Sequence, residues 1–201
     1  MFLFLDVASP IPEFHLINDK KIIDSFKILE NNTVKLSDKI IPTYLEINNT
    51  HNLSKNLTNL IITIGPGSYT ALRVGASFIA GLSQSISLPV SLISIQTIYN
   101  YIKRTDKEIG IYFESSNNQK FFSYKKQDHF INEKVENENF ILPKFISSVF
   151  YNVKSPKFIS DKITSESFSI KDIVLKMYNI LEFDKNSIIK PIYISNNNIL
   201  N

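Results

Sequence analysis

The chain has 201 residues, of which 43% are hydrophobic and 12% aromatic, enough to fill the core of one large domain or two small lobes. The formal net charge is +3. Only two residues are arginines, Arg73 and Arg104, and the lysines are scattered, a distribution that disfavours a nucleic-acid-binding surface. The absence of cysteine excludes disulfides, thiolate nucleophiles and Cys-ligated zinc. No apolar run approaches membrane-spanning length and no basic leader precedes Phe2, so we expect a cytoplasmic protein with no membrane association.

Alternating apolar residues in the first third predict three strands that pair as a meander. A helix follows, which Ser37 can cap and in which Pro42 removes one internal hydrogen bond. The apolar run Leu60–Ile64 then predicts a buried strand that ends in a glycine-rich turn before a second helix. These elements are expected at residues 2–7, 13–17, 22–29, 37–51, 60–64 and 68–87.

This order of three strands, a helix, a strand and a helix is that of the ribonuclease-H-like lobe, from which actin-like and hexokinase-like proteins are built in pairs. We therefore predict an α/β fold with two such lobes, residues 1–102 and a smaller, shortened lobe at 103–201. After Val90 the sequence predicts a short strand, and after Ser169 a helix with a capping box. Between them we expect helices at 94–102 and 144–151, and strands at 109–113, 121–124 and 157–159.

The turn between the buried strand and the second helix carries the most specific motif. Gly65 and Gly67 allow unusual backbone angles, Ser68 can cap the helix, and Ala71 and Gly75 give it a small face for close packing. The segment is similar to the G-P-G-S-[FY]-T-G-[LV]-R-[IV]-G signature of the TsaB (YeaZ) family, with Ala71 in place of a glycine. The matching residues are Gly65, Pro66, Gly67, Ser68, Tyr69, Thr70, Arg73 and Gly75.

Three further segments resemble the same family less closely. The opening strand ends in Asp6, as in the family, but Val7 departs from its D-T-[AS]-T continuation. Residues 35–42 resemble a helix start in which Leu36 replaces a histidine, and residues 191–194 resemble the family's P-x-Y-[LI]-R with Ser195 in place of the arginine.

The sequence favours no catalytic, cofactor or metal site. A P-loop needs a lysine after its last glycine, and the turn after Asp6 contains two prolines and no glycine that could cradle a phosphate. Asp6 is expected to cap or solvate a turn rather than to bind a ligand. No histidine has metal-ligand spacing, and Ser68 lacks the surroundings of a nucleophile. The histidines are His15, His51 and His129.

The second helix has an unusual outer face. One arc is apolar and should pack on the sheet, while the opposite arc is small and nearly uncharged instead of rich in Lys and Glu. Small side chains would let a partner helix approach closely; the alternative is a helix sandwiched inside its own domain. This arc consists of Arg73, Ala76, Ser77, Ala80, Ser83 and Gln84.

The resemblance implies a partner for this face. TsaB-like proteins pack the first two helices of the N-terminal lobe against the same helices of the catalytic paralogue TsaD, or of a second copy. The corresponding positions here include Ile40, Ile41, Tyr44 and Leu45 on the first helix.

The function implied is that of a non-catalytic subunit for threonylcarbamoyl modification of adenosine in tRNA. Such a subunit supports a TsaD-like enzyme, meets a TsaE-like ATPase through the complex, and contacts tRNA indirectly. The alternative is an actin-fold small-molecule kinase or ATPase, which the distribution of glycines disfavours. A third reading, a direct tRNA binder, predicts a lysine-rich stripe that the sequence lacks.

Overall fold

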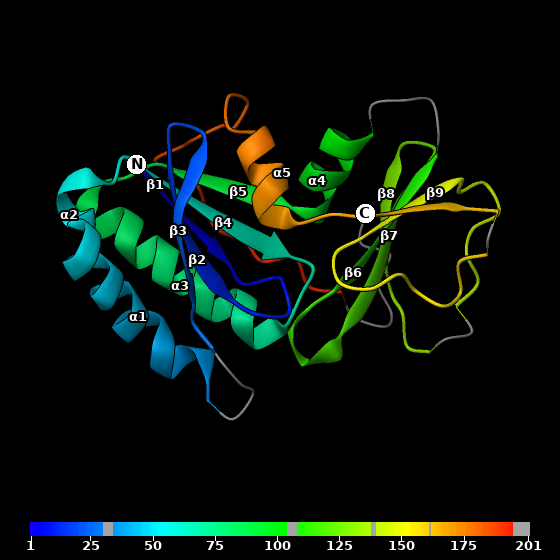
Figure 1. Cartoon of the computed structure of the whole chain (residues 1–201), viewed down its shortest axis with the longest axis horizontal. Helices are drawn as coiled ribbons and strands as arrows, with labels where there is room; N and C mark the ends of the chain where they lie inside the picture. Colours follow the sequence, from blue (N-terminus) through cyan, green and yellow to red (C-terminus); the bar gives the residue numbers. More distant parts are fainter. Residues whose placement is uncertain (30–33, 104–107, 138–139, 161, 195–201) are drawn as a thin grey trace.

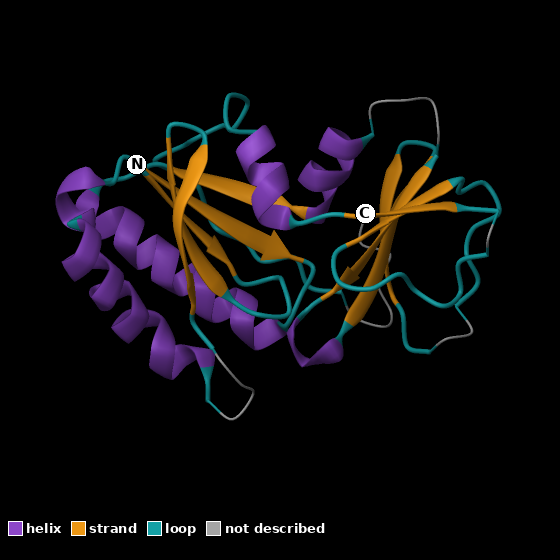
Figure 2. Ribbon diagram, in the orientation of Figure 1, coloured by secondary structure: helices purple, strands orange, loops and turns teal. Residues whose placement is uncertain are grey.

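The computed structural model describes residues 1–29, 34–103, 108–137, 140–160 and 162–194. In this part of the chain, two five-stranded sheets stand side by side, and most of the helices cover the first one (Figures 1 and 2). None of the described helices is long and apolar enough to cross a bilayer. The predicted α/β fold with a reduced second lobe is confirmed.

The first sheet has the strand order β3-β2-β1-β4-β5. β1 pairs antiparallel with β2 and parallel with β4, so β1 and β4 occupy its centre. Both central strands are buried, which explains the continuous apolar runs Leu3–Leu5 and Leu60–Ile62. The strands are β1 (Phe2–Asp6), β2 (Glu13–Asn18), β3 (Lys21–Lys27), β4 (Asn59–Gly65) and β5 (Val90–Ser94).

Helices cover both faces of this sheet. On one face α3 packs against β4 and α1 packs against α3, while α4 and α5 lie on the other face (Figure 1). The helices are α1 (Leu36–His51), the short α2 (Leu53–Asn56), α3 (Tyr69–Ile86), α4 (Ile95–Ile102) and α5 (Ile170–Lys176).

The second sheet repeats the topology of the first. Its order is β10-β9-β6-β7-β8, with β6 antiparallel to β7 and parallel to β9, just as β1 is to β2 and β4. Among the described residues, no α-helix lies between β8 and β9 or between β9 and β10, where the first lobe has α1 and α3. Its elements are β6 (Ile109–Glu114), a 3-10 turn (Ser116–Asn118), β7 (Lys120–Lys126), β8 (His129–Lys134), β9 (Ser148–Tyr151) and β10 (Thr164–Ser167).

The segment after α5 returns to the first sheet. Tyr178 stacks on Phe2 of β1 with ring centroids 4.9 Å apart. The backbones of Asp184 and Val90 exchange hydrogen bonds of 3.0 and 3.2 Å beside β5. Buried residues of α5 also belong to the hydrophobic core around β1 and β4. The division at residue 103 stays a prediction, and the last part of the chain adds contacts to the first lobe.

Two predicted elements in the second lobe are wrong. Residues 148–151, assigned to a helix at 144–151, form strand β9 because they pair with β6. The strand expected at 157–159 is absent, and the sheet is extended instead by β10 at 164–167. In both cases pairing within the sheet overrides a local pattern of apolar residues. Strand β8 was not predicted.

The helix caps also differ from expectation. α1 begins at Leu36 with Lys35 as its N-cap residue, so Ser37 does not cap it. Ser169 is the N-cap residue of α5, but its side chain accepts no capping hydrogen bond from the helix. A capping box occurs instead at α4, where the Ser94 hydroxyl accepts from the backbone N–H of Thr97 and the Thr97 hydroxyl accepts from that of Ser94.

Two glycines of α3 give a matched test of its packing. A Cβ added at Gly75 would lie 2.9 Å from both methyl carbons of the fully buried Val7, whereas one at Gly81 would meet nothing within 4 Å. Gly75→Ala is therefore expected to lower the free energy of unfolding by about 1–3 kcal/mol. Gly81→Ala should raise it by about 0.5–1 kcal/mol, because alanine favours the helix. Urea titration measures both, and equal stabilisation by the two changes would contradict close packing at Gly75.

Candidate functional site

The glycine-rich turn joins the end of β4 to α3. Gly65 has a φ of 106°, and a Cβ there would lie 2.9 Å from the carbonyl oxygen of Ile192. Gly67 does not have a left-handed backbone, contrary to expectation, but a Cβ there would lie 3.3 Å from the Cα of Ala8. Ser68 is the N-cap residue of α3, but its side chain accepts no capping hydrogen bond, so its predicted side-chain cap is wrong. Gly65 thus has the unusual backbone angle expected of it, whereas close approach to the backbone of Ala8 explains the glycine at position 67.

Helix α3 turns only some of its small residues toward its own domain. Ala71, Gly75 and Ala76 are buried, and Ser83 is buried with its hydroxyl donating to the carbonyl of Leu88 at 2.6 Å. The predicted outer arc is therefore split between the domain interior and the free surface. Of the ten residues expected at a partner interface, Ile40, Ala76 and Ser83 are buried, Tyr44 and Ala80 are half-buried, and Ile41, Leu45, Arg73, Ser77 and Gln84 are exposed.

A groove runs between α1 and α3. Phe78 of α3 contacts Tyr44 of α1, with ring centroids 5.4 Å apart, and reaches Phe14 of β2 at 5.6 Å. Ile41 and Tyr69 stand at the groove with about half of their surface exposed, at 54% and 55%. Its lining is mostly apolar, with Arg73 as the one charged residue, and consists of Ser37, Ile40, Ile41, Tyr69, Thr70, Arg73, Val74, Ser77 and Phe78.

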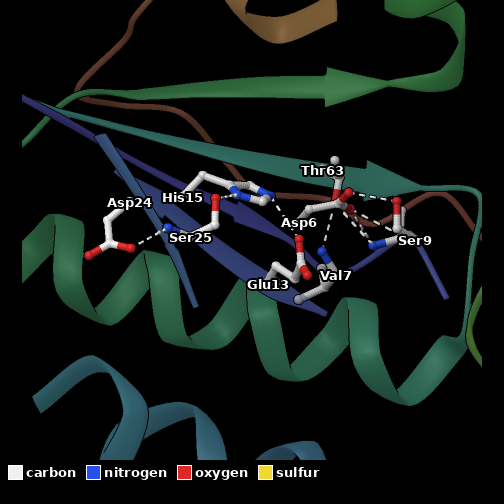
Figure 3. Close-up of polar contacts among 9 residues, drawn as sticks. Asp6, Val7, Ser9, Glu13, His15, Asp24, Ser25 and Thr63 are labelled. Carbon is white, nitrogen blue, oxygen red and sulfur yellow. Dashed lines mark hydrogen bonds and ion pairs between the residues drawn. The ribbon is translucent and has the colours of Figure 1, made fainter. Parts of the chain in front are cut away.

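A polar cluster occupies the end of β1 (Figure 3). The buried carboxylate of Asp6 accepts hydrogen bonds from the backbone N–H groups of Ala8 and Ser9 at 3.0 and 3.1 Å. It also accepts from the hydroxyls of Thr63 at 3.0 Å and Ser9 at 2.6 Å. The expected turn-capping role of Asp6 is confirmed. Thr63 was missed, although a single threonine inside the apolar run of β4 is a visible signal.

The electrostatics of this cluster suit a structural carboxyl group. Burial raises the pKa of Asp6 above its ordinary value, while the hydrogen bonds from Ser9, Thr63 and Ala8 oppose that rise. Both carboxylate oxygens already accept from these groups, which occupies them in holding the turn. The arrangement links β1 to β4 and shapes the backbone on which Gly67 rests.

His15 lies beside this cluster on β2 (Figure 3). Its Nδ1 is 2.8 Å from the Ser25 hydroxyl, and its Nε2 is 3.5 Å from a carboxylate oxygen of Glu13. Burial, together with the smaller effect of the nearby positive charge of Lys171, lowers the pKa of His15 to about 4. His15 is therefore neutral at physiological pH and packs as a polar core residue.

A cleft separates the end of β1 from the second sheet. It is lined by Asp6 and the proline-containing turn after it on one side, and by Asn152, Val153 and residues 168–171 on the other. Within the described ranges, no group of three His, Asp or Glu side chains is arranged to hold a metal ion. His51 lies elsewhere, 3.2 Å from Asp24, and His129 lies on β8.

Comparison with known proteins places this architecture in a family. The family model described as TsaD, tRNA N6-adenosine threonylcarbamoyltransferase, matches residues 32–147, more than half of the chain. The chain belongs to this family. It is a TsaB (YeaZ)-type member, as the following relatives indicate.

The tRNA threonylcarbamoyladenosine biosynthesis protein TsaB of Bacillus subtilis (strain 168) is 21% identical over 122 residues. The match covers 60% of this chain and 53% of that protein, so it spans about half the length of the curated relative. YeaZ from Pseudomonas aeruginosa superposes with a TM-score of 0.62 at 13% identity, covering 96% of this TsaB-type chain and 99% of the other. A second Pseudomonas aeruginosa structure, of an uncharacterized protein similar to peptidase YeaZ, gives a TM-score of 0.61 at 14% identity over the same shares. These structures share the two-lobed fold with the TsaB-type chain.

Part of the motif and part of the predicted interface meet at the α1–α3 groove. The structure brings Tyr69, Thr70 and Arg73 together with Ile41 at the α1–α3 groove, and it places Val74 and Phe78 there too. Val74 and Phe78 belong to the apolar arc of α3, for which the sequence predicts packing on the sheet. Ser195 lies outside the described residues.

Substitutions of Asp6 test whether its carboxyl group stabilises the fold, as a structural residue should. Asp6→Asn is expected to be no more than about 1 kcal/mol less stable than the wild type, because an amide oxygen can still accept from Ala8, Ser9 and Thr63. Asp6→Ala leaves buried donors unpaired and should cost at least about 2 kcal/mol. Chemical denaturation at neutral pH measures both.

The pH dependence gives the corresponding control. Since burial raises the native pKa of Asp6 above its ordinary value of 3.8, the native state holds the proton more tightly than the unfolded state. The contribution of the Asp6 carboxyl group to the stability of the wild type is fully present below pH 3.8 and is lost as the pH rises through the native pKa. The stability of Asp6→Asn relative to the wild type should therefore increase with pH across this interval. A difference that falls with rising pH would contradict the burial argument.

Proposed function

We propose that this chain is a non-catalytic partner subunit for threonylcarbamoyl modification of adenosine in tRNA, which acts in the cytoplasm by binding and supporting a TsaD-like catalytic subunit. The observation that supports this most is the apolar groove between α1 and α3, which opens on the same helix as the family motif. We place the interface at this groove and at the accessible residues of the two helices that form it: Ile41, Tyr44, Leu45, Arg73, Ser77, Ala80 and Gln84.

The groove has the chemistry of a helix-docking surface. Ile41, Leu45 and Tyr69 each expose half or more of their surface, at 54%, 50% and 55%, on two adjacent helices. Covering one such side chain fully contributes about 1.5–3 kcal/mol, which makes this the kind of surface that a partner helix would bury. Ser77 and Ala80 are small, so a partner helix could approach the α3 backbone closely.

The cleft gives little support to the alternative, an actin-fold kinase or ATPase. The turn after Asp6 is occupied by Pro10, Ile11 and Pro12 instead of a glycine loop whose N–H groups could surround phosphates. Asp6 is engaged by four hydrogen bonds within the fold.

In the proposed role the chain requires no cofactor, meets a TsaE-like ATPase through the complex, and contacts tRNA indirectly. A homodimer through the same groove would compete with the TsaD-like partner.

A charge placed in the groove tests the proposed interface. Ser77→Arg should leave the melting temperature near that of the wild type, because Ser77 is solvent-exposed, and should abolish binding to the TsaD-like partner. Asn100→Arg is the matched control, since it adds the same charge at an exposed position of α4, on the other face of the sheet. Titration calorimetry with the partner measures affinity. Wild-type affinity in Ser77→Arg would remove this groove from the interface.

The non-catalytic role makes a separate prediction. ATP added to the pure chain should neither shift its melting temperature nor be hydrolysed, because the turn after Asp6 offers no phosphate cradle. A TsaE-like ATPase in the same assays provides the positive control. Stoichiometric ATP binding in calorimetry would favour the kinase or ATPase alternative.

A further inference from the structure

Arg73 is the only charged side chain of α3 and stands exposed at the groove. Its Nη1 donates a hydrogen bond of 3.0 Å to the hydroxyl of Tyr69, one turn earlier. The guanidinium carbon lies 5.1 Å from the centre of the Tyr69 ring. A solvent-exposed arginine normally samples many rotamers, so these two contacts restrict its freedom before any partner arrives.

Tyr69 is itself held from the far end of the sequence. Its ring centroid lies 4.6 Å from that of Tyr193. The backbone next to Tyr193 is fixed to the first sheet, because the N–H of Ile192 donates to the carbonyl of Ile64 at 2.8 Å. The orientation of Arg73 therefore depends on a chain of contacts from β4 through the C-terminal segment to the start of α3.

The guanidinium is oriented but not paired. Within the described residues, the ion pairs do not include Arg73, so its charge faces the groove and the solvent. A guanidinium group has five N–H donors in a planar fork that matches a carboxylate or a phosphate. The geometry thus presents a ready anion-binding group.

The surroundings favour a carboxylate on a protein over a phosphate on RNA. The groove next to Arg73 is lined by apolar side chains such as Ile41, Val74 and Phe78, and no lysine lines it. Nucleic-acid surfaces combine several positive charges, whereas one positive charge in an apolar groove complements an apolar helix that carries one carboxylate.

We propose that Arg73, oriented by Tyr69 and Tyr193, is the specificity-determining residue of the α1–α3 groove and pairs with a carboxylate on the docked helix of the TsaD-like partner. This inference rests on the proposed function. It adds the charge that the partner must present. It also gives the C-terminal segment a part in recognition, since the ring of Tyr193 contacts that of Tyr69.

The test measures the Kd of the full chain for the TsaD-like partner at low and high salt. Arg73→Gln should weaken binding by at least tenfold, and the loss should shrink at high salt. Arg73→Lys keeps the charge without the planar fork, so its Kd should lie between those of the wild type and Arg73→Gln. Tyr193→Ala should also weaken binding, whereas Tyr193→Phe keeps the ring contact and should bind as the wild type does. Lys176→Gln, which removes one exposed charge from α5 on the other face of the first sheet, is the control and should bind normally.

The outcomes separate the inference from the proposed function. If the wild type itself does not bind the partner, both are overturned. If the wild type binds and a folded Arg73→Gln, judged by its melting temperature, binds equally well, the inference alone is overturned. The same holds if Arg73→Gln keeps its affinity for the partner but loses affinity for unmodified tRNA, because the anion would then be a phosphate. A tenfold or greater loss of partner binding with reduced salt dependence supports it.

Discussion

Helix α3 lies against the end of β1 at a distance that only a glycine permits. At Gly75 the space for a Cβ is taken by the two methyl groups of Val7, and at Gly67 the chain passes close to the backbone of Ala8. Asp6 holds Ala8 and Ser9 in place through their N–H groups and ties them to Thr63 of β4. Because β1, β4 and α3 are fixed to one another in this way, the first turn of α3 and the side of the groove that it forms have a defined position. The interface proposed here depends on that local geometry.

The two lobes use one sheet topology but cover it differently. The first lobe buries its sheet under long helices, whereas the described part of the second lobe has none between β8 and β10. Aromatic side chains from irregular segments supply a core there: Phe140 and Phe158 pack on each other at 5.1 Å and on Phe122 at 5.3 and 6.2 Å. Large rings can bury much area without a helix to carry them, which lets a shortened lobe keep a hydrophobic centre. α5 and the segment after it then return to the first lobe.

The first lobe could be predicted closely from the sequence because its signals are local. Continuous apolar strands, the glycine-rich turn and the long apolar arc of α3 each determine one element, and the structure places them within a few residues of expectation. The second lobe was harder, since β9 is only four residues long and owes its conformation to pairing with β6. The predicted helix caps are wrong for a related reason. A serine near a helix start satisfies the sequence pattern, but the local backbone conformation determines whether its hydroxyl can accept from an N–H.

The sequence predicted which helices form the candidate interface, but only some of its residues. A helical wheel separates two faces, yet α3 contacts the sheet on one side and α1 on another, so Ala76 and Ser83 are buried while Val74 and Phe78 reach the groove. The contact of Tyr69 with Tyr193 joins residues more than a hundred positions apart and has no signature in either segment alone.

The most direct test of the central claim is hydrogen–deuterium exchange of the chain with and without a TsaD-like partner. The account predicts slower exchange on complex formation in peptides from Leu36–His51 and Tyr69–Ile86, which contain the two helices of the groove. Peptides from β7 and β8 should exchange unchanged, because they lie in the second sheet. Protection confined to the second sheet or to the cleft around Asp6, with the two helices unaffected, would contradict it.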